Sequence, residues 1–382
     1  MRIAFLCKRR YMGKDVILDR YARLYEIPFQ LARLGHVVRG FCLDYQGDTA
    51  GVWAHEAEPG QLTWESRPLG RFVLPALATY PQHLLHQLRA FAPDVLIGAS
   101  DIPHVVLGAW LARRLHVPYA ADLYDNFEGF GQARIPGMVP LLRRAVRGAN
   151  LVTTTSEPLR ELVLDTYLAR GQVVAMPSTV DKAVFRPLDR GACRRALGLP
   201  ERARLVGTAG GLHRDKGVGA LYAAWPAIAA AGPDVHLVLA GPVDSAFPPP
   251  TDERVHYLGQ IPHARTAELF NALDVGVIYL RDTVFGCYCF PQKAYEMLAC
   301  RLPIVAARIG VMPQLLASAP EALYRADDAA DLARAVLAQL AHPQIAQVAI
   351  DDWSQLIDRL EGHLRTLVTP PPRPTARAQL PS

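Results

Sequence analysis

The sequence predicts an α/β protein built from two doubly wound parallel sheets, each covered by helices on both faces. Short runs of Val, Ile and Leu alternate with segments of helical periodicity, which is the pattern of strands buried in a parallel sheet. The alternation stops at a polar stretch near the middle of the chain and then restarts. A length of 382 residues is also more than one hydrophobic core usually serves. We therefore expect two domains.

The first half of the chain supplies one sheet and its helices. Strands are expected at six apolar runs, which are residues 2–7, 37–43, 95–98, 119–123, 151–154 and 173–176. Helical periodicity separates them at residues 21–34, 105–115, 139–147 and 158–167. Gly35 follows the first of these helices, where glycine commonly forms the C-cap. We assign residues 1–183 to an N-terminal Rossmann-like domain.

The second half repeats this organisation after a polar linker at residues 184–201. Strands are expected at residues 204–208, 235–240, 256–258, 275–278 and 304–307, and helices at 222–231, 266–272, 293–300 and 329–340. Residues 202–350 therefore form a second Rossmann-like domain. An amphipathic helix is expected at 351–368, and the Pro-rich residues 369–382 are expected to be disordered. Because ligands bind beyond the carboxyl ends of parallel strands, we expect a ligand cleft between the domains.

Composition excludes several classes of protein. The net charge is +5, and no apolar run approaches the roughly 20 residues that span a bilayer, so we expect a cytoplasmic protein. The first apolar run is stopped by Lys8-Arg9-Arg10, which is too early for a signal peptide. The six scattered cysteines lack zinc spacing, so we expect no metal and no other cofactor. A modest charge without a basic, aromatic-rich stripe argues against nucleic-acid binding.

Residues 290–300 are the most informative segment of the chain. They place Lys293 and Glu296 on the opening turns of a helix, directly after Phe290, Pro291 and Gln292. Backbone N–H groups and a cation at a helix N-terminus favour an anion such as phosphate. A carboxylate one turn further on can accept hydrogen bonds from ribose hydroxyls. The segment therefore predicts a binding site for a nucleotide diphosphate.

A second candidate phosphate site follows the first strand of the second domain. Gly210 and Gly211 allow the backbone to approach a ligand, and Arg214 and Lys216 can meet a diphosphate. An ordinary strand–helix turn, which also uses glycines, is the alternative. The loop matches neither the Walker motif nor G-x-G-x-x-G, which argues against a dehydrogenase. Only five of the 41 basic residues are lysines, and two of the five fall in these two sites.

The order of these segments resembles that of the retaining glycosyltransferases of family four, which have the GT-B fold. The resemblance covers most of residues 1–368 and also includes residues 31–38, 155–159, 176–181, 255–259 and 272–277. It implies two domains that face each other across a cleft, and a last helix, opened by Trp353, that packs back on the N-terminal domain. It also implies that Lys216 contacts the donor diphosphate, that Glu296 holds the ribose, and that the amides of residues 290–292 face the donor.

Three positions depart from the family pattern. Tyr288 stands where the first glutamate of an E-x7-E pair would fall. Gly211 replaces a frequent arginine, for which Arg214 is the candidate substitute. A histidine of the family's N-terminal domain aligns with Tyr124, so Tyr124 or Asp125 is the candidate catalytic group.

Two further residues are candidates for the acceptor side. The resemblance loosely places Gly13 in a loop near the acceptor, and His104 follows the end of a strand, where it either lines the cleft or has a capping or solvent-exposed role. Residues 129–156 lack acidic side chains and carry a basic set of Arg134, Arg143, Arg144 and Arg147. We interpret this set as a solvated helix face, with contact to anionic lipid at the inner face of the membrane as the alternative.

We therefore expect a glycosyltransferase that moves a sugar from a nucleotide-diphosphate donor on the second domain to an acceptor on the first. By resemblance, transfer retains the anomeric configuration and needs no metal. A glycan, a glycolipid and a metabolite all remain open as the acceptor, and polysaccharide or lipid-linked assembly is the first hypothesis. A catalytically weak nucleotide-sugar-binding or assembly subunit is one alternative. Another GT-B enzyme, such as a sugar-nucleotide epimerase or a phosphorylase, is the second.

Overall fold

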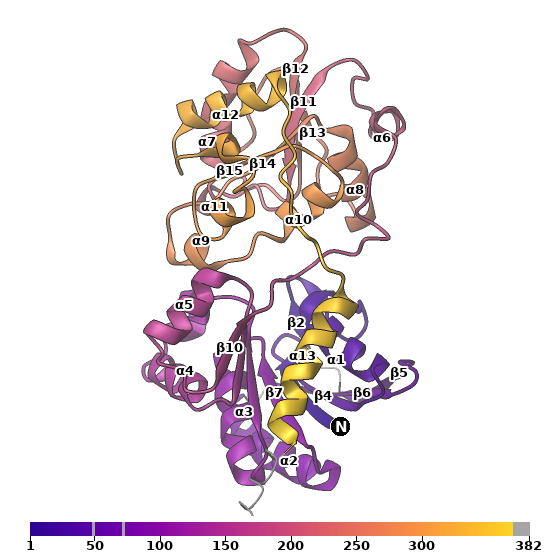
Figure 1. The fold of residues 1–382 in the computed structure, drawn as a ribbon, viewed down its shortest axis with the longest axis vertical. Helices are drawn as coiled ribbons and strands as arrows, with labels where there is room; N and C mark the ends of the chain where they lie inside the picture. The colour runs from indigo at the N-terminus through magenta and orange to yellow at the C-terminus, as the bar shows by residue number, and fades with distance from the viewer. Residues whose placement is uncertain (48–49, 71–72, 370–382) are drawn as a thin grey trace, which may run out of the picture.

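Two α/β domains follow one another along the long axis of the computed structural model (Figure 1). The structure describes residues 1–47, 50–70 and 73–369. The first domain holds an eight-stranded sheet in the order β10-β9-β8-β7-β1-β4-β6-β5, and the second a six-stranded sheet in the order β13-β12-β11-β14-β15-β16. Every strand pair in both sheets is parallel except β5 with β6. The prediction of two doubly wound domains is confirmed.

Helices cover both faces of the first sheet. Its strands are β1 (Arg2–Lys8), β4 (Val37–Asp44), β5 (Gly51–His55), β6 (Gln61–Pro68), β7 (Val95–Ala99), β8 (Tyr119–Leu123), β9 (Leu151–Thr154) and β10 (Gln172–Ala175). One face packs against α2 (Val73–Phe91), α3 (Ile102–Leu115), α4 (Met138–Arg147) and α5 (Glu157–Asp165). The other face packs against α1 (Ala22–Arg33) and α13 (Trp353–Val368).

The second sheet is covered in the same way. Its strands are β11 (Arg204–Ala209), β12 (Val235–Ala240), β13 (Val255–Tyr257), β14 (Val275–Ile278), β15 (Ile304–Ala307) and β16 (Leu323–Tyr324). The helices α7 (Val218–Ala229) and α12 (Ala329–Ala341) contribute to one core. The opposite core includes α6 (Arg190–Leu197), α8 (His263–Ala272), α10 (Gln292–Ala299) and α11 (Met312–Leu315).

The last helix returns to the first domain, as the resemblance implies. Figure 1 shows α13 in yellow beside α1 and β7. Its apolar stripe, which consists of Leu356, Ile357, Leu360 and Leu364, is buried in the core on that face of the first sheet. Glu361 on the same helix accepts a hydrogen bond from Nε2 of His36 at 3.0 Å. The chain therefore passes between the domains twice.

Both sheets direct the carboxyl ends of their central strands toward the space between the domains. β1 lies at the switch point of the first sheet, between β7 and β4, and β11 lies at that of the second, between β12 and β14. The residues that end or follow these two strands, Lys8 and Gly210, line the same cleft. The cleft thus lies where doubly wound sheets bind their ligands.

Several elements were not predicted. Helix α2 contains Pro81 and begins near Pro75, and prolines usually interrupt a helix. The expected linker at 184–201 contains α6, whose Cys193 is buried in the core of the second domain. The predicted disorder at residues 369–382 concerns residues that, except for 369, lie outside the described part of the chain. Within the described part, no helix is long and apolar enough to span a membrane.

Candidate active site

A cleft of about 1090 Å³ opens between the carboxyl ends of the two sheets. Both domains and the loops after β1, β8, β11 and β14 contribute to its walls. The predicted site residues found in its lining are Tyr124, Asp125, Gly210, Gly211, Lys216, Phe290, Pro291, Gln292, Lys293 and Glu296. The structure thus brings the predicted donor segments together with the candidate catalytic pair.

The glycine loop after β11 is packed tightly against its neighbours. Gly210 has a φ of +114°, and a Cβ at this position would lie 3.2 Å from Nζ of Lys293. Gly241, which follows β12, has a φ of +125°, and a Cβ there would lie 2.1 Å from the carbonyl oxygen of Gly210. Backbone conformation therefore favours glycine at both positions, and at Gly241 space requires it as well. Because Gly210 has no side chain, the ammonium group of Lys293 can lie directly against the glycine loop.

Two lysines supply the positive charge of the second-domain wall. Nζ of Lys293 lies 4.7 Å from the ring centroid of Tyr279, and Nζ of Lys216 lies 3.9 Å from that of Phe285. Burial lowers the pKa of Lys293 to about 8, and the charge of Lys216 contributes to the shift. Neither lysine has a carboxylate oxygen within 4.0 Å among the described residues. Two neighbouring cations without a protein counter-ion form a site for a polyanion.

Helix α10 begins in the cleft and presents Glu296 one turn from its start. No side chain caps its N-terminus, so backbone N–H donors of the first turn stay available to a ligand. Oε1 of the buried Glu296 lies 3.4 Å from Nε2 of Gln292 and 3.6 Å from Nε2 of His263. The neighbouring Glu296 carboxylate raises the pKa of His263. Gln292 and His263 thus both contact the same oxygen of Glu296.

Four residues singled out from the sequence lie elsewhere. The Arg214 guanidinium lies over the ring of Phe247, 5.6 Å from its centroid, outside the cleft lining. Lys293, not Arg214, therefore lies beside the glycine loop. His104 is 1% exposed, and its Nδ1 lies 2.6 Å from Oδ1 of Asp101, the N-cap of α3, so it does not line the cleft.

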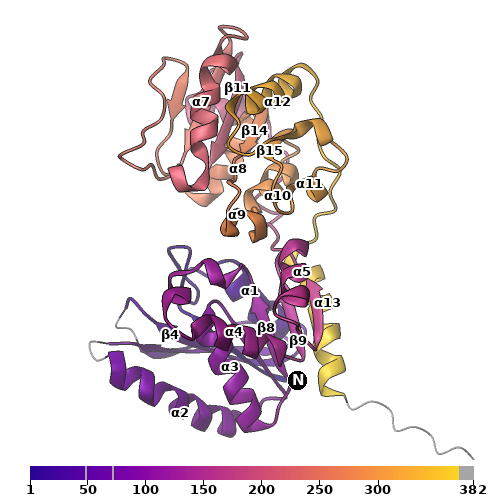
Figure 2. The same cartoon turned by 90° about the vertical axis from the view of Figure 1, so that its left-hand side faces the viewer.

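The other two positions are Gly13 and Tyr288. Gly13, with a φ of +77°, is at the tip of a hairpin. Its neighbours Met12 and Lys14 line the cleft, but Gly13 itself does not. Tyr288 ends the short helix α9 (Val284–Tyr288), outside the lining. Its carbonyl accepts a hydrogen bond from the Ser156 hydroxyl at 2.9 Å, and α9 meets the start of α5 there (Figure 2). This position serves a contact between the domains.

The candidate catalytic pair follows β8 on the first-domain wall. The hydroxyl of Tyr124 accepts a hydrogen bond from Nζ of Lys8 at 2.9 Å, and burial raises the pKa of this tyrosine. Burial also raises the pKa of Asp125 to about 6, although the charges of Lys216 and Lys8 oppose the shift. Its Oδ1 accepts the backbone N–H of Asn126 at 2.8 Å. At neutral pH, Asp125 is a buried carboxylate between cations of the two domains.

A buried ion pair holds the end of β8 in place. The single Nε–H of Arg23, on α1, donates a bifurcated hydrogen bond to both oxygens of Asp122, at 3.0 Å each, and Nη2 donates another to Oδ1 at 2.6 Å. Both side chains are at most 2% exposed. Thr153 donates a further hydrogen bond to Asp122 at 2.6 Å. Because Asp122 precedes Tyr124 and Asp125 by two and three residues, this pair fixes the strand from which both project.

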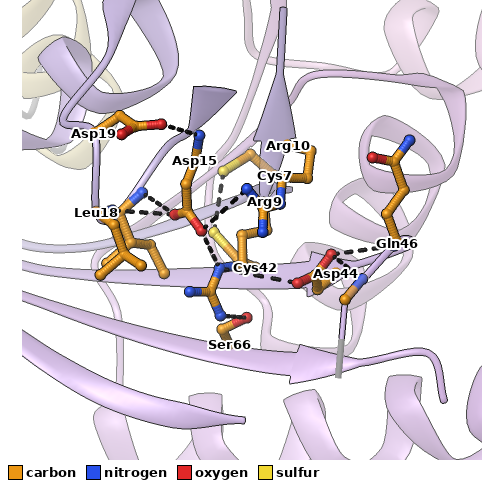
Figure 3. A network of polar contacts seen from close by, with 12 residues as sticks. Cys7, Arg9, Arg10, Asp15, Leu18, Asp19, Cys42, Asp44, Gln46 and Ser66 are labelled. Carbon is orange, nitrogen blue, oxygen red and sulfur yellow. Dashed lines mark hydrogen bonds and ion pairs between the residues drawn. The ribbon is translucent and has the colours of Figure 1, made fainter. Parts of the chain in front are cut away.

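A second buried network fixes the hairpin formed by β2 (Arg10–Tyr11) and β3 (Lys14–Asp15), as Figure 3 shows. Nε of Arg9 donates to Oδ2 of Asp15 at 2.9 Å, and Nη1 of Arg9 donates to the Ser66 hydroxyl at 3.2 Å. Oδ1 of Asp15 accepts the backbone N–H groups of Ile17 and Leu18. The hairpin that carries Tyr11, Met12 and Lys14 into the cleft is thus held by buried polar contacts to the first domain.

Sequence reasoning missed several cleft residues, among them Lys8, Tyr11, Tyr21 and His263. Lys8 ends β1 at the switch point of the sheet, and that position was the available signal. No comparable signal marks Tyr21 or His263, whose rings lie 6.3 Å apart across the domain boundary. In the described part of the chain, no three His, Cys, Asp or Glu side chains are grouped as metal ligands.

Comparisons with known proteins agree with this geometry. A family model described as "Glycosyl transferase 4-like domain" matches residues 23–179, and one described as "Glycosyl transferases group 1" matches residues 203–342. The two matches cover most of the chain, one for each domain. The chain belongs to the group 1 glycosyltransferases of family-four type. This family consists of enzymes with the GT-B fold.

Among curated relatives, the glycosyltransferase is similar to two named D-inositol 3-phosphate glycosyltransferase. That of Mycolicibacterium gilvum is 32% identical over 176 residues, which are 43% of this chain and 38% of that protein. That of Segniliparus rotundus is 25% identical over 375 residues, which are 90% of this chain and 75% of that protein. The chain thus spans less than two thirds of the first relative's length.

Solved structures share the fold at low sequence identity. Sucrose-phosphate synthase from Thermosynechococcus elongatus superimposes with a TM-score of 0.68 and 18% identity, and 96% of each chain is covered. An Anabaena protein in complex with UDP gives a TM-score of 0.62 and 17% identity, with the same coverage of both chains. These likenesses extend over both domains of the glycosyltransferase.

Proposed function

We propose that this glycosyltransferase transfers a sugar from a nucleoside diphosphate sugar, bound on the second domain, to an acceptor hydroxyl on the first domain. The observation that carries the proposal is the convergence of Lys216, Lys293 and the uncapped start of α10 on one end of the cleft. Both cations lack a carboxylate within 4.0 Å among the described residues, and a diphosphate supplies the missing counter-charge. The Anabaena neighbour with UDP supports this choice of ligand.

The leaving group would be stabilised by protein charge, without a metal ion. As the bond between sugar and diphosphate breaks, negative charge grows on the phosphate oxygens. Lys216, Lys293 and the N–H donors of α10 are already fixed around that position, so they favour the transition state over the bound donor. Glu296 would accept hydrogen bonds from the ribose hydroxyls, held in place by Gln292 and His263.

Asp125 is proposed to activate the acceptor. Its pKa of about 6 leaves it ionised at neutral pH and basic enough to take up a proton from an attacking hydroxyl. Its position between Lys8 and Lys216 places the carboxylate at the junction of the two walls. Retention of the anomeric configuration belongs to this proposal and rests on the resemblance to family four.

The nature of the acceptor is also part of the proposal. Two relatives are named for an inositol phosphate, and one of Bacillus subtilis, 24% identical over 298 residues, is named as a putative teichuronic acid biosynthesis glycosyltransferase. Glycan, glycolipid and metabolite acceptors are all consistent with an open cleft. Contact with a membrane has weaker support, because Arg143 pairs with Glu128 and Arg147 donates to the carbonyl of Tyr167.

Calorimetric titration with UDP, GDP, ADP and dTDP tests the donor site. We expect one of them to bind, and we expect Lys216→Ala and Glu296→Ala to weaken that binding while Lys182→Ala, an exposed lysine outside the cleft, leaves it unchanged. Folded protein that binds none of the four would contradict the proposal. With the matching nucleotide sugars, release of nucleotide only when an acceptor is added indicates a transferase. Release together with an altered sugar, but without an acceptor, indicates an epimerase.

A further inference from the structure

The lysines of this chain are concentrated in the cleft. Of the five, Lys8, Lys14, Lys216 and Lys293 line it, and only Lys182 does not. Within the described residues, none of the five has a carboxylate oxygen within 4.0 Å, whereas arginines form most of the ion pairs. In the described part of the chain, the cleft therefore carries four cations that form no close ion pair with a carboxylate of the protein.

These four lysines lie on two walls. Lys216 and Lys293 belong to the second domain, where the charge of one affects the pKa of the other. Lys8 and Lys14 belong to the first domain, where Lys8 ends β1 and Lys14 begins the second strand of the hairpin. The carboxylates that act on Lys8 are Asp101 and Asp125, and Asp125 also feels Lys216. Lys8 is thus a positive centre on the other wall from the two donor-site lysines, and Asp125 interacts electrostatically with both Lys8 and Lys216.

The part of the cleft around Lys8 is aromatic. Its ammonium lies 5.9 Å, 5.5 Å and 5.7 Å from the ring centroids of Tyr11, Tyr124 and Phe130. One of its three N–H groups is used by the Tyr124 hydroxyl, and no second acceptor for them occurs among the described side chains. An aromatic wall with one convergent charged group is the usual lining of a small-molecule site, and sugar rings can pack their apolar faces on such rings.

We infer that the first-domain wall binds an acceptor sugar that carries an anionic group, a phosphate monoester or a carboxylate, with Lys8 as its main contact and Lys14 at the rim. The aromatic rings of Tyr11, Tyr124 and Phe130 hold the sugar ring beside the anion. This arrangement places an acceptor hydroxyl near Asp125. The inference rests on the proposed function, because it assigns the acceptor of the same cleft.

The two buried networks described above support this assignment. Arg9 and Asp15 fix the hairpin that carries Tyr11 and Lys14, and Arg23 and Asp122 fix the strand end that carries Tyr124. A wall that is held this firmly before any ligand arrives loses little conformational entropy on binding. Preorganised side chains around an ammonium favour a small charged ligand.

Binding of charged and neutral sugars to nucleotide-loaded protein tests the inference. The nucleotide diphosphate chosen by the four-nucleotide titration is added first, and glucose 6-phosphate, glucuronate and glucose are then titrated separately. We expect at least one of the two charged sugars to bind at least tenfold more tightly than glucose, and the difference to shrink in high salt. Lys8→Gln is expected to remove the preference, Lys8→Arg to retain most of it, and Lys182→Gln to leave it intact.

The outcomes separate this inference from the proposed function. Nucleotide binding with equal affinities for charged and neutral sugars, or a preference that survives in Lys8→Gln, overturns the inference and leaves the proposed function standing. Failure to bind any nucleotide contradicts the proposed function, whereas a Lys8-dependent preference for charged sugars in nucleotide-free protein still supports the inference. Vesicles of phosphatidylcholine with and without phosphatidylinositol form a further arm. Lys8-dependent binding to the second kind alone identifies the anion as part of a lipid.

Discussion

The part of the second-domain wall that is proposed to hold the diphosphate consists of backbone and two lysines, whereas the first-domain wall consists mainly of aromatic and charged side chains. The diphosphate part comes from the glycine loop, Lys216 and the start of α10. The first-domain wall comes from the end of β1, the β2–β3 hairpin and the segment after β8, and it depends on two ion pairs buried beneath it. A backbone site suits a ligand part that never varies, such as a diphosphate. A side-chain site can be changed residue by residue for a particular acceptor.

The largest effect on activity is expected when the charge of Asp125, on the first-domain wall, is removed. Asp125→Asn keeps the size of the side chain and removes the proton acceptor. We expect kcat to fall by about 10²–10⁴-fold, the usual contribution of a general base, while the Kd of the nucleotide stays unchanged. Steady-state kinetics beside calorimetry measure both values. A variant that keeps the wild-type kcat would show that Asp125 is not the general base.

The support beneath the first-domain wall is tested by Arg23→Met. Removal of one partner leaves the Asp122 carboxylate uncompensated in a buried site, and we expect a loss of about 3–5 kcal/mol in the free energy of unfolding. Urea denaturation measures it. Arg204→Met is the matched control, because Arg204 pairs with Asp234 at the surface, where we expect less than about 1 kcal/mol. Equal losses of unfolding free energy in the two variants would show that the buried pair of Arg23 and Asp122 does not stabilise the protein more than a surface pair does.

The second-domain wall is tested by Lys293→Met. This change removes the charge beneath Gly210 and keeps an unbranched side chain of similar length. A charge-assisted hydrogen bond contributes about 1.5–3 kcal/mol, so we expect nucleotide affinity to fall by about 10- to 150-fold. Binding of charged sugars to the first-domain wall should not change. If both bindings weaken equally, the two walls do not act as separate sites.

The pH dependence of kcat/KM sharpens the comparison, because each wall contributes one limb. Asp125 must be ionised, so the rate rises as pH passes about 6. Lys293 must be charged, so the rate falls as pH passes about 8. We expect about a tenfold loss one pH unit beyond either value. Asp125→Asn should abolish the acid limb and Lys293→Met the alkaline limb, and a profile that both variants leave unchanged would contradict the assignment.

The smallest effect is expected for His263→Gln. His263 is half-exposed and holds Glu296 at 3.6 Å, and a pair of this kind contributes at most about 1 kcal/mol. We therefore expect up to about fivefold weaker binding of the nucleotide, and no change for inorganic pyrophosphate, which lacks a ribose. Competition calorimetry separates the two ligands. Weaker binding of pyrophosphate would place His263 at the phosphates.

The difference between the walls also explains what the sequence could predict. The donor residues Gly210, Lys216 and Glu296 lie in contiguous segments whose spacing is set by local backbone geometry, so a pattern reveals them. Lys8, Tyr11 and His263 meet only because β1, the hairpin and α8 converge in the tertiary structure. Arg214 and His104 show the opposite error. Each has suitable chemistry and a suitable position in the sequence. In the structure, however, Arg214 lies over the ring of Phe247 and His104 contacts the carboxylate of Asp101, and neither lines the cleft.

Secondary structure followed the same rule. Strands that are mostly apolar and buried, such as β1 and β12, were predicted within one or two residues. Helix α2 was missed because Pro81 lies inside it. The β5–β6 pair was missed because no residue of β5 is fully buried and β6 buries only every second residue, so neither strand is a continuous apolar run. Local periodicity identifies an element only where tertiary packing does not override it.

The return of α13 to the first domain determines the order in which this protein can be completed. Residues 1–183 are translated before α13, yet in the described structure α13 covers the apolar surface beside α1 and β7, mainly through Leu356, Ile357, Leu360 and Leu364. On the ribosome, the N-terminal domain must therefore wait, with this surface uncovered, until the whole second domain has been synthesised. A nascent chain in this state presents an apolar surface for the time needed to make about 170 residues. Of the two domains, the one that is translated first therefore completes its core last.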